Sequence, residues 1–307
     1  MIPPYLRCLA WLGLLLASTA SARPDPDAVL GETLVERGSA FYRFEHFELD
    51  SRDSQRHYRV RLAIPRRPPP ADGYPALYLL DGNAALQALR EDWLAELDAA
   101  EPPLLVLIGP ASDRRLDLPA RTRDYTPGWP DGRPLQRYGE HDGGGSSAFR
   151  ELLEQRIRPA VAARQPLDAS RQAIWGHSFG GLFVLDTLFA APTSFQTYIA
   201  ASPSLWWQPG LLAELERSYR GGAQANLLLL RGSEEGTATR DAAGDSPRAR
   251  AMARLSDDAL QRLAERLGGH DGLEVTYREL PGLGHGPMLA VSLHLALRLA
   301  AGLPIRD

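Results

Sequence analysis

The chain has 307 residues, of which 34 are basic and 38 are acidic, and its formal net charge is −4 at pH 7. This balance excludes the strongly basic character of a protein that binds nucleic acid. Hydrophobic residues make up 44% of the chain, enough for one large core, and the length is too short for two enzyme domains of ordinary size.

The N-terminus has the pattern of a cleavable signal peptide. Arg7 supplies a positive charge, residues 8–17 are apolar, and Ala20-Ser21-Ala22 fits an A-x-A cleavage site. We therefore predict a signal peptide over residues 1–22 and a single mature catalytic domain over residues 23–307, exported to the periplasm.

The apolar run is shorter than the roughly 20 residues of a membrane span, so no stable membrane insertion is expected after cleavage. An uncleaved anchor is the alternative. The only cysteine, Cys8, lies inside this segment. The mature protein is therefore expected to have no disulfide, no cysteine nucleophile and no zinc–thiolate site, as fits an exported, disulfide-free bacterial protein.

Eight segments have the pattern of strands. The first two, residues 41–49 and 58–64, alternate apolar and polar side chains, as half-exposed strands near a sheet edge do. The next five are continuously apolar, which is typical of parallel strands covered on both faces. These five run over residues 76–80, 104–108, 172–175, 197–201 and 227–230, and the last strand runs over 273–280.

Segments with helical periodicity alternate with these strands, over residues 84–97, 147–163, 181–189 and 246–267. This order predicts an α/β-hydrolase fold: a mostly parallel central sheet with antiparallel N-terminal strands and helices on both faces. Residues 113–147 interrupt the rhythm and are rich in Arg, Asp, Pro and Gly. A loop of that length inside a compact domain is usually functional or disordered.

The motif Gly176-His177-Ser178-Phe179-Gly180-Gly181 carries the main chemical signal. It follows the strand 172–175 and opens the helix 181–189, which is the strand–turn–helix setting of a nucleophile elbow. We therefore predict Ser178 as the nucleophile; an ordinary glycine-rich turn is the alternative. His177 is interpreted as a structural residue that points away from Ser178.

A serine nucleophile needs a base, and in this fold the chain order is serine, acid, histidine. His285 follows the last strand and precedes the terminal helix, where the fold presents its base, so we prefer it to His270 and His294. The acid is expected after the strand 227–230, at Glu234 or Glu235. We prefer Glu235, and a serine–histidine dyad without an acid stays open.

Two backbone amides are expected to stabilise the oxyanion. One is the amide of Phe179, directly after the nucleophile. The other is the amide of Asn83, in the turn Asp81-Gly82-Asn83-Ala84 that follows the strand 76–80. A plain turn between strand and helix is the alternative for Asn83.

Four segments, taken in order, resemble the periplasmic siderophore esterases that hydrolyse the trilactone of enterobactin and salmochelin. They are Tyr78-Leu79-Leu80-Asp81-Gly82-Asn83-Ala84, Arg123-Asp124-Tyr125-Thr126-Pro127, the elbow with Leu182-Phe183-Val184-Leu185-Asp186 after it, and Ala201-Ser202-Pro203-Ser204-Leu205. The terminal His285-Gly286 fits the base of that family. Some periplasmic members lack the acid, so the role of Glu235 stays open.

The resemblance implies a serine esterase that hydrolyses ferric-enterobactin, or a close triscatecholate, and releases its iron. Such a substrate is aromatic and anionic, so Arg121, Arg123, Trp206 and Trp207 are predicted to contact it. Solvated arginines and packed tryptophans are the alternative. No cofactor and no metal site are predicted, because the iron arrives within the substrate.

Two rival functions stay open. One is a carboxylesterase or thioesterase on the same fold that acts on small acyl esters. The other is a siderophore-binding protein without catalysis, although the presence of both Ser178 and His285 argues against it. The sequence predicts no particular oligomeric state.

Overall fold

The computed structural model describes residues 28–222, 224–235 and 247–305. The predicted signal peptide, residues 1–22, lies outside the described residues. Among the helices that are described, none combines the length and the apolar character needed to cross a membrane.

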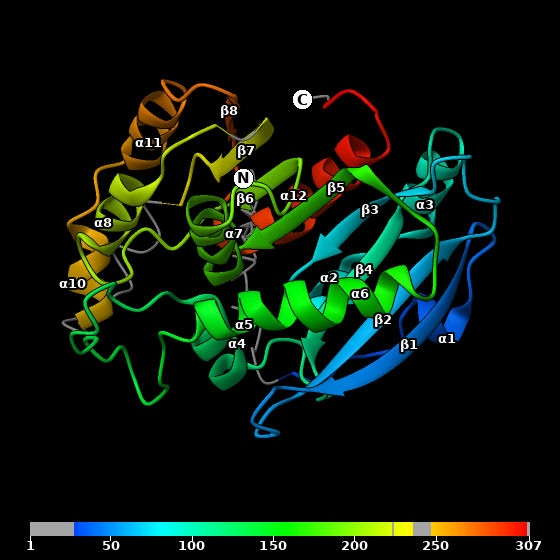
Figure 1. The fold of residues 1–307 in the computed structure, drawn as a ribbon, viewed down its shortest axis with the longest axis horizontal. Helices are drawn as coiled ribbons and strands as arrows, with labels where there is room; N and C mark the ends of the chain where they lie inside the picture. Colours follow the sequence, from blue (N-terminus) through cyan, green and yellow to red (C-terminus); the bar gives the residue numbers. More distant parts are fainter. Residues whose placement is uncertain (1–27, 223, 236–246, 306–307) are drawn as a thin grey trace, which may run out of the picture.

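Within the described residues, one mixed sheet of eight strands organises the chain (Figure 1). Its order is β1-β2-β4-β3-β5-β6-β7-β8; β2 pairs antiparallel with β1 and β4, and the other neighbours are parallel. The strands are β1 (Tyr42–Asp50), β2 (His57–Pro65), β3 (Tyr74–Leu79), β4 (Leu104–Pro110), β5 (Leu167–His177), β6 (Thr197–Ala201), β7 (Ala225–Gly232) and β8 (Leu273–Leu280). This arrangement confirms the predicted fold class.

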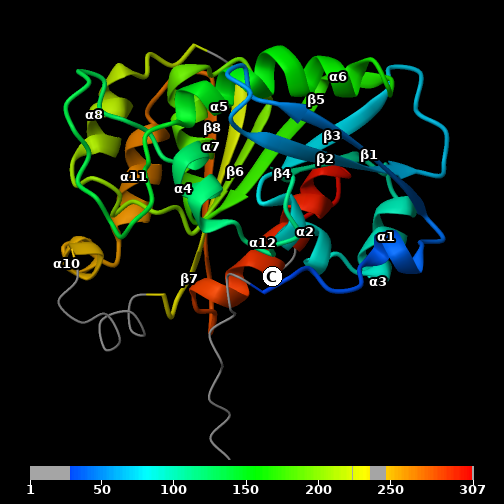
Figure 2. The same ribbon diagram turned by 90° about the horizontal axis from the view of Figure 1, so that it is seen from below.

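Helices cover both faces of the sheet (Figure 2). One face carries α1 (Leu34–Arg37), α2 (Gly82–Ala88), α3 (Glu91–Asp98) and α12 (His285–Ala300). The other carries α4 (Leu118–Tyr125), α5 (Ser146–Leu152), the π-helical turn η1 (Leu153–Ile157), α6 (Arg158–Ala162), α7 (Phe179–Ala190), α8 (Leu211–Ser218) and α11 (Ala259–Leu267). A short helix, α10 (Pro247–Ala253), packs with α8 around a small separate cluster.

The central strands are apolar on both faces because two hydrophobic layers enclose them. On β5, Ile174 faces the layer beneath α7, whereas Trp175 faces the layer beneath α12. On β3, Tyr78 faces the layer beneath α7 and Leu77 faces the layer beneath α12. Because successive side chains of a strand point to opposite faces, a buried parallel strand needs an uninterrupted apolar run. The layers hold the carboxyl ends of β3, β5, β6 and β7 together at one edge of the sheet.

Several predicted boundaries differ from the structure. The segment 84–97 is broken at Leu89, whose extended backbone (φ −61°, ψ 138°) ends α2 while its side chain stays buried. The segment 246–267 is divided into α10 and α11, with residues 254–258 between them. The long segment 113–147 contains a helix, α4, that begins where the carboxylate of Asp117 accepts a hydrogen bond from the amide of Ala120. Because this segment is rich in polar residues, its sequence does not show the apolar periodicity of a helix. The helix carries Arg121 and Arg123.

Candidate active site

Ser178 lies at the tight turn between β5 and α7. Its φ of 61° and ψ of −115° are strained for a residue with a side chain, as is typical of a nucleophile elbow. Its amide donates a hydrogen bond of 2.9 Å to the carbonyl oxygen of Ala201, at the end of β6. A Cβ on Gly176 would lie 2.3 Å from the carbonyl carbon of Gly180, so the turn closes this tightly only with glycine at 176.

The imidazole of His285 reaches Ser178 from the far end of the chain. β8 ends at Leu280, and His285 is the first residue of α12. Its Nε2 lies 3.1 Å from the Oγ of Ser178, and its Nδ1 lies 3.2 Å from the Oε2 of Glu235. The structure thus brings together the three side chains that the sequence predicts as nucleophile, base and acid.

Hydrogen bonds orient the carboxylate of Glu235 in the turn after β7. Its Oε1 accepts from the amide of Gly232 at 2.7 Å and from the hydroxyl of Ser202 at 2.5 Å. Burial acts to raise the pKa of Glu235, but the contacts with His285, Ser202 and Gly232 outweigh it and hold this pKa below its ordinary value. The carboxylate is therefore ionised at neutral pH. The alternative acid, Glu234, is exposed.

His177 is buried against the ring of His285. Its Nε2 lies 3.0 Å from the carbonyl oxygen of His285, and the two ring centroids are 4.6 Å apart. Burial, with the nearby charges of His285 and Arg121, lowers the pKa of His177 well below 6.5, so the ring is neutral at pH 7. A neutral imidazole nitrogen facing a carbonyl must carry the proton, so Nε2 donates to His285. This contact connects the elbow to the first residue of α12.

Phe179 and Asn83 lie in the first turns of α7 and α2, where amides have no partner inside their own helix. The side chain of Asn83 is occupied elsewhere: its Oδ1 accepts from Arg61 at 2.7 Å, and its Nδ2 donates to the carbonyls of Ser112 and Arg114. Only its backbone amide is left for an oxyanion. The turn before it is strained, because Asp81 has φ 50° and ψ 50°.

Arg121 is placed differently from the prediction that it contacts substrate. Its side chain is buried, and its Nε and Nη2 donate to the two carboxylate oxygens of Asp81 at 3.0 and 2.9 Å. Its Nη2 also lies 3.4 Å from the carbonyl oxygen of His177, and its guanidinium stacks on Phe179 at 5.3 Å. A buried carboxylate needs a paired cation, so Arg121 stabilises the turn at Asp81 and packs against Phe179 of the elbow.

The two tryptophans are largely buried in the small cluster beside α8. Both contact the ring of Phe179, with centroids 5.5 Å away for Trp206 and 5.7 Å for Trp207, and the Nε1 of Trp207 donates to the carbonyl of Pro127. Trp206 is therefore mostly packed inside the protein, which agrees with the alternative stated for it. Part of Trp207 lines a cavity of about 440 Å³ together with the exposed Arg123.

This cavity is rich in basic groups. Arg123, Arg137 and His141 line it with Trp207, and Asp142 pairs with Arg137 at 3.1 Å. Trp207 links the cavity to the elbow through its contact with Phe179, the residue after Ser178, and no residue of the elbow lines the cavity itself. Arg123 and Trp207, both predicted to contact substrate, thus share one cavity.

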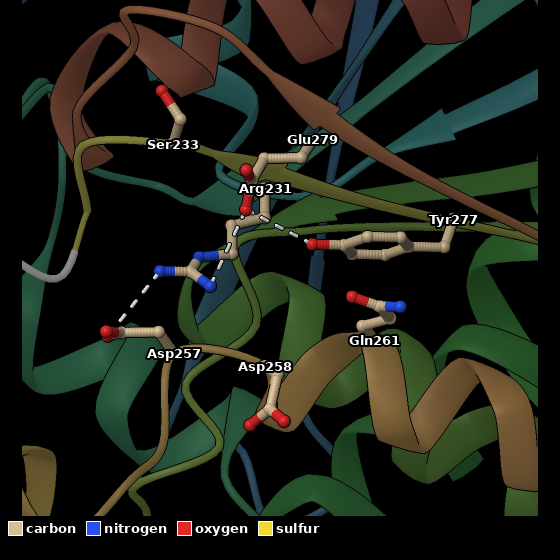
Figure 3. A pocket seen from close by; sticks show the side chains of 7 residues that line it. All are labelled: Arg231, Ser233, Asp257, Asp258, Gln261, Tyr277 and Glu279. Carbon is tan, nitrogen blue, oxygen red and sulfur yellow. Dashed lines mark hydrogen bonds and ion pairs between the residues drawn. The ribbon is translucent and has the colours of Figure 1, made fainter.

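A smaller cavity of about 280 Å³ lies between β7, β8 and α11 (Figure 3). Arg231 extends across it toward Asp257 and Glu279, at 3.9 and 3.7 Å, and Tyr277 and Gln261 complete the walls (Figure 3). None of the side chains predicted from the sequence as functional lines it. Among the described residues, no group of His, Cys, Asp or Glu side chains is arranged to hold a metal ion.

Two serines that contact Ser178 or Glu235 have no role assigned from the sequence. Ser202 donates to Glu235, and the Oγ of Ser204 lies 3.3 Å from the Oγ of Ser178. Both belong to the segment after β6, Ala201-Ser202-Pro203-Ser204-Leu205. The signals in the sequence are the resemblance of this segment to the siderophore esterases and the place of both serines within three residues of the end of a strand.

Comparisons with known proteins give one consistent group of relatives. A family model described as putative esterase matches residues 51–262. The apo-salmochelin esterase of Escherichia coli is 37% identical over 297 residues, which cover 95% of this chain and 89% of that protein. The ferri-bacillibactin esterase of Bacillus subtilis is 33% identical over 272 residues, 82% and 87% of the two chains. The solved enterobactin and salmochelin hydrolase IroE is 35% identical with a TM-score of 0.69, over 88% of this chain and 99% of that one.

Proposed function

The chain belongs to the putative esterase family, and we propose that it is a serine esterase that hydrolyses the ester bonds of a catecholate siderophore. Its catalytic residues are Ser178 as nucleophile, His285 as base and Glu235 as acid. The 3.1 Å contact between the Oγ of Ser178 and the Nε2 of His285, at the tip of a strained elbow, is the observation that carries this proposal.

The reaction runs in two steps. The Nε2 of His285 takes the proton of Ser178 as its Oγ bonds to the ester carbonyl carbon, and Glu235 stabilises the imidazolium that forms. The amides of Phe179 and Asn83 stabilise the negative charge on the carbonyl oxygen. His285 then gives its proton to the leaving alkoxide. Water repeats the sequence, with Ser178 as the leaving group, and the carboxylic acid is released.

The substrate assignment rests on relatives and on the basic cavity. Relatives that align with most of the chain are named for the hydrolysis of apo-salmochelin, of ferri-bacillibactin, and of enterobactin and salmochelin. A ferric triscatecholate carries negative charge on aromatic rings, and a cavity of about 440 Å³ with Arg123, Arg137, His141 and Trp207 suits one such ring. The iron belongs to the substrate.

We also propose export to the periplasm as one catalytic domain, residues 23–307, after removal of residues 1–22. The charged start, the short apolar run and the A-x-A site support this. The proposal is tested by expressing the full-length chain in a bacterial host and determining the N-terminus of the protein recovered from the periplasm. An N-terminus near Arg23 is expected, and full-length protein in the cytoplasm contradicts it.

The substrate is tested by incubating the purified protein with ferric-enterobactin and separating the products by chromatography. We expect the intact trilactone to disappear and linear esters of its monomers to form. A p-nitrophenyl ester is measured in parallel. If the p-nitrophenyl ester is hydrolysed while the trilactone stays intact, the protein is a carboxylesterase of small acyl esters. If neither compound is hydrolysed, the result indicates a protein that binds the siderophore without catalysis.

A further inference from the structure

A second hydroxyl lies against the candidate nucleophile. Ser204 is almost fully buried, with 2% of its surface exposed, and its Oγ lies 3.3 Å from the Oγ of Ser178. The proposed triad does not use this residue. The inference below rests on the proposed function, because it concerns the reacting oxygen of Ser178.

The direction of the hydrogen bond between the two serines follows from the rest of the triad. An ionised Glu235 only accepts, so the Nδ1 of His285 carries the ring proton and donates to it across 3.2 Å. The Nε2 of a neutral His285 then has a lone pair, and the hydroxyl of Ser178 donates its one proton there. That leaves the oxygen of Ser178 only as an acceptor toward Ser204. The hydroxyl of Ser204 must therefore be the donor.

The backbone holds Ser204 in this position. Its amide donates to the carbonyl oxygen of Ser178 at 3.1 Å, and its own carbonyl accepts from the amide of Trp207 at 3.0 Å. A Cβ on Gly181 would lie 2.8 Å from the carbonyl oxygen of Ala201 and 3.2 Å from the Cα of Pro203. Glycine at 181 thus lets the segment that carries Ser204 lie directly against α7.

We propose that Ser204 is a fourth catalytic residue, whose hydroxyl donates a hydrogen bond to the Oγ of Ser178 and stabilises the charge on that oxygen. Charge develops there twice: when His285 removes the proton during attack, and when Ser178 leaves the acyl carbon during deacylation. In the acyl-enzyme the same oxygen belongs to an ester, which is a weaker acceptor. The bond is therefore stronger in both transition states than in the states before them, which is the condition for accelerating a reaction.

The test measures Ser204→Ala on a p-nitrophenyl ester and on a serine-directed fluorophosphonate, neither of which needs a siderophore. Stopped-flow kinetics give the acylation burst and the steady-state rate, and mass spectrometry gives the rate at which Ser178 is labelled. We expect each rate to fall by about ten-fold, which corresponds to about 1.4 kcal/mol of transition-state stabilisation. Ser204→Cys, which replaces the hydroxyl by a slightly larger group that is a weaker donor, is expected to lie between alanine and wild type.

Ser146→Ala is the matched control. Ser146 is also buried and donates to Asp186 at 2.7 Å, but Asp186 keeps its ion pair with Arg150, and none of these residues contacts the triad. We expect wild-type rates for this variant. Because Ser204 acts on Ser178 and not on His285, Ser204→Ala should also leave the acid limb of the pH–rate profile in place.

Burst, steady-state and labelling rates within two-fold of wild type for both Ser204 variants overturn the proposal. So does a loss of rate in Ser204→Ala that appears equally in Ser146→Ala, since it then reflects the loss of any buried hydroxyl. Different results contradict the proposed function. Full activity of Ser178→Ala would show that Ser178 is not the nucleophile. Hydrolysis of the p-nitrophenyl ester with ferric-enterobactin left intact would show that the siderophore is not the substrate.

Discussion

Replacing Glu235 is the perturbation that separates a triad from a dyad. Its Oε2 lies 3.2 Å from the Nδ1 of His285, while its Oε1 is held by Gly232 and Ser202. Glu235→Ala removes the charge that stabilises the imidazolium. Glu235→Gln keeps the shape, but its amide group turns toward Nδ1 if its oxygen keeps the bonds from Gly232 and Ser202. The Nδ1 of His285 then accepts, and its proton moves to Nε2, where it blocks the base.

The size of the effect follows from the geometry. Two unit charges about 4 Å apart attract by about 1 kcal/mol in water and by about 4 kcal/mol at an effective dielectric constant near 20. The side chain of Glu235 is 14% exposed, which favours the upper part of this range. A loss of about 2 to 4 kcal/mol in the transition state corresponds to a fall in kcat of roughly 30- to 1,000-fold. Glu235→Gln is expected to lose at least as much as Glu235→Ala.

The assay is steady-state hydrolysis of a p-nitrophenyl ester by wild type, Glu235→Ala, Glu235→Gln and Glu234→Gln. Glu234 is exposed and adjacent in sequence, so it serves as the matched carboxylate control, and its variant is expected to stay within about two-fold of wild type. Turnover of both Glu235 variants within three-fold of wild type would refute the triad and leave a serine–histidine dyad.

The same carboxylate has a consequence for stability against pH. Its hydrogen bonds and the charge of His285 hold the pKa of Glu235 below its ordinary value of 4.5, despite the opposing effect of burial. A depressed pKa means that the stabilisation is fully present above 4.5 and is lost as the pH falls through the folded-state value. The difference in melting temperature between wild type and Glu235→Gln should therefore shrink below pH 4.5. A difference that stays constant into the acid range contradicts this assignment.

Three further predictions concern the surroundings of the triad. Arg121→Ala leaves Asp81 buried without its cation and should lower the free energy of unfolding by about 3 to 5 kcal/mol in a urea titration; a loss below 1 kcal/mol contradicts the buried pair. Gly176→Ala forces a Cβ to within 2.3 Å of the carbonyl carbon of Gly180 and should abolish p-nitrophenyl ester turnover, so normal turnover would show that the elbow relaxes. Arg123→Gln should lower the ratio of ferric-enterobactin to p-nitrophenyl ester turnover by about ten-fold, and an unchanged ratio rules out contact between this guanidinium and the siderophore.

The meeting of Ser178, His285 and Glu235 was predictable because local sequence decides where each side chain leaves the sheet. Ser178 follows one apolar strand, Glu235 follows another, and His285 follows the last. Parallel strands end at the same edge, so side chains that directly follow them meet there. This reasoning does not depend on the distance along the chain, so it holds for Ser178 and His285 although they are 107 positions apart.

The direction of side chains in the connecting segments was not predictable in this way. Arg121 is predicted from the sequence as a substrate contact on a loop, but it lies on a helix and turns inward to Asp81, 40 residues earlier in the chain. Trp206 is held by contacts with Phe179 and Tyr138 from two other segments. The contact between Ser204 and Ser178 depends on β6 lying beside β5. Each of these features depends on partners that only the assembled sheet brings together.

We propose that Ser178 attacks the ester bonds of a catecholate siderophore. The most direct measurement compares wild type and Ser178→Ala at equal concentration on ferric-enterobactin, with the loss of intact trilactone followed by chromatography and folding verified by circular dichroism. We predict that wild type cleaves the trilactone and that Ser178→Ala is slower by at least about a thousand-fold. A folded Ser178→Ala variant that cleaves the trilactone at the wild-type rate would contradict it.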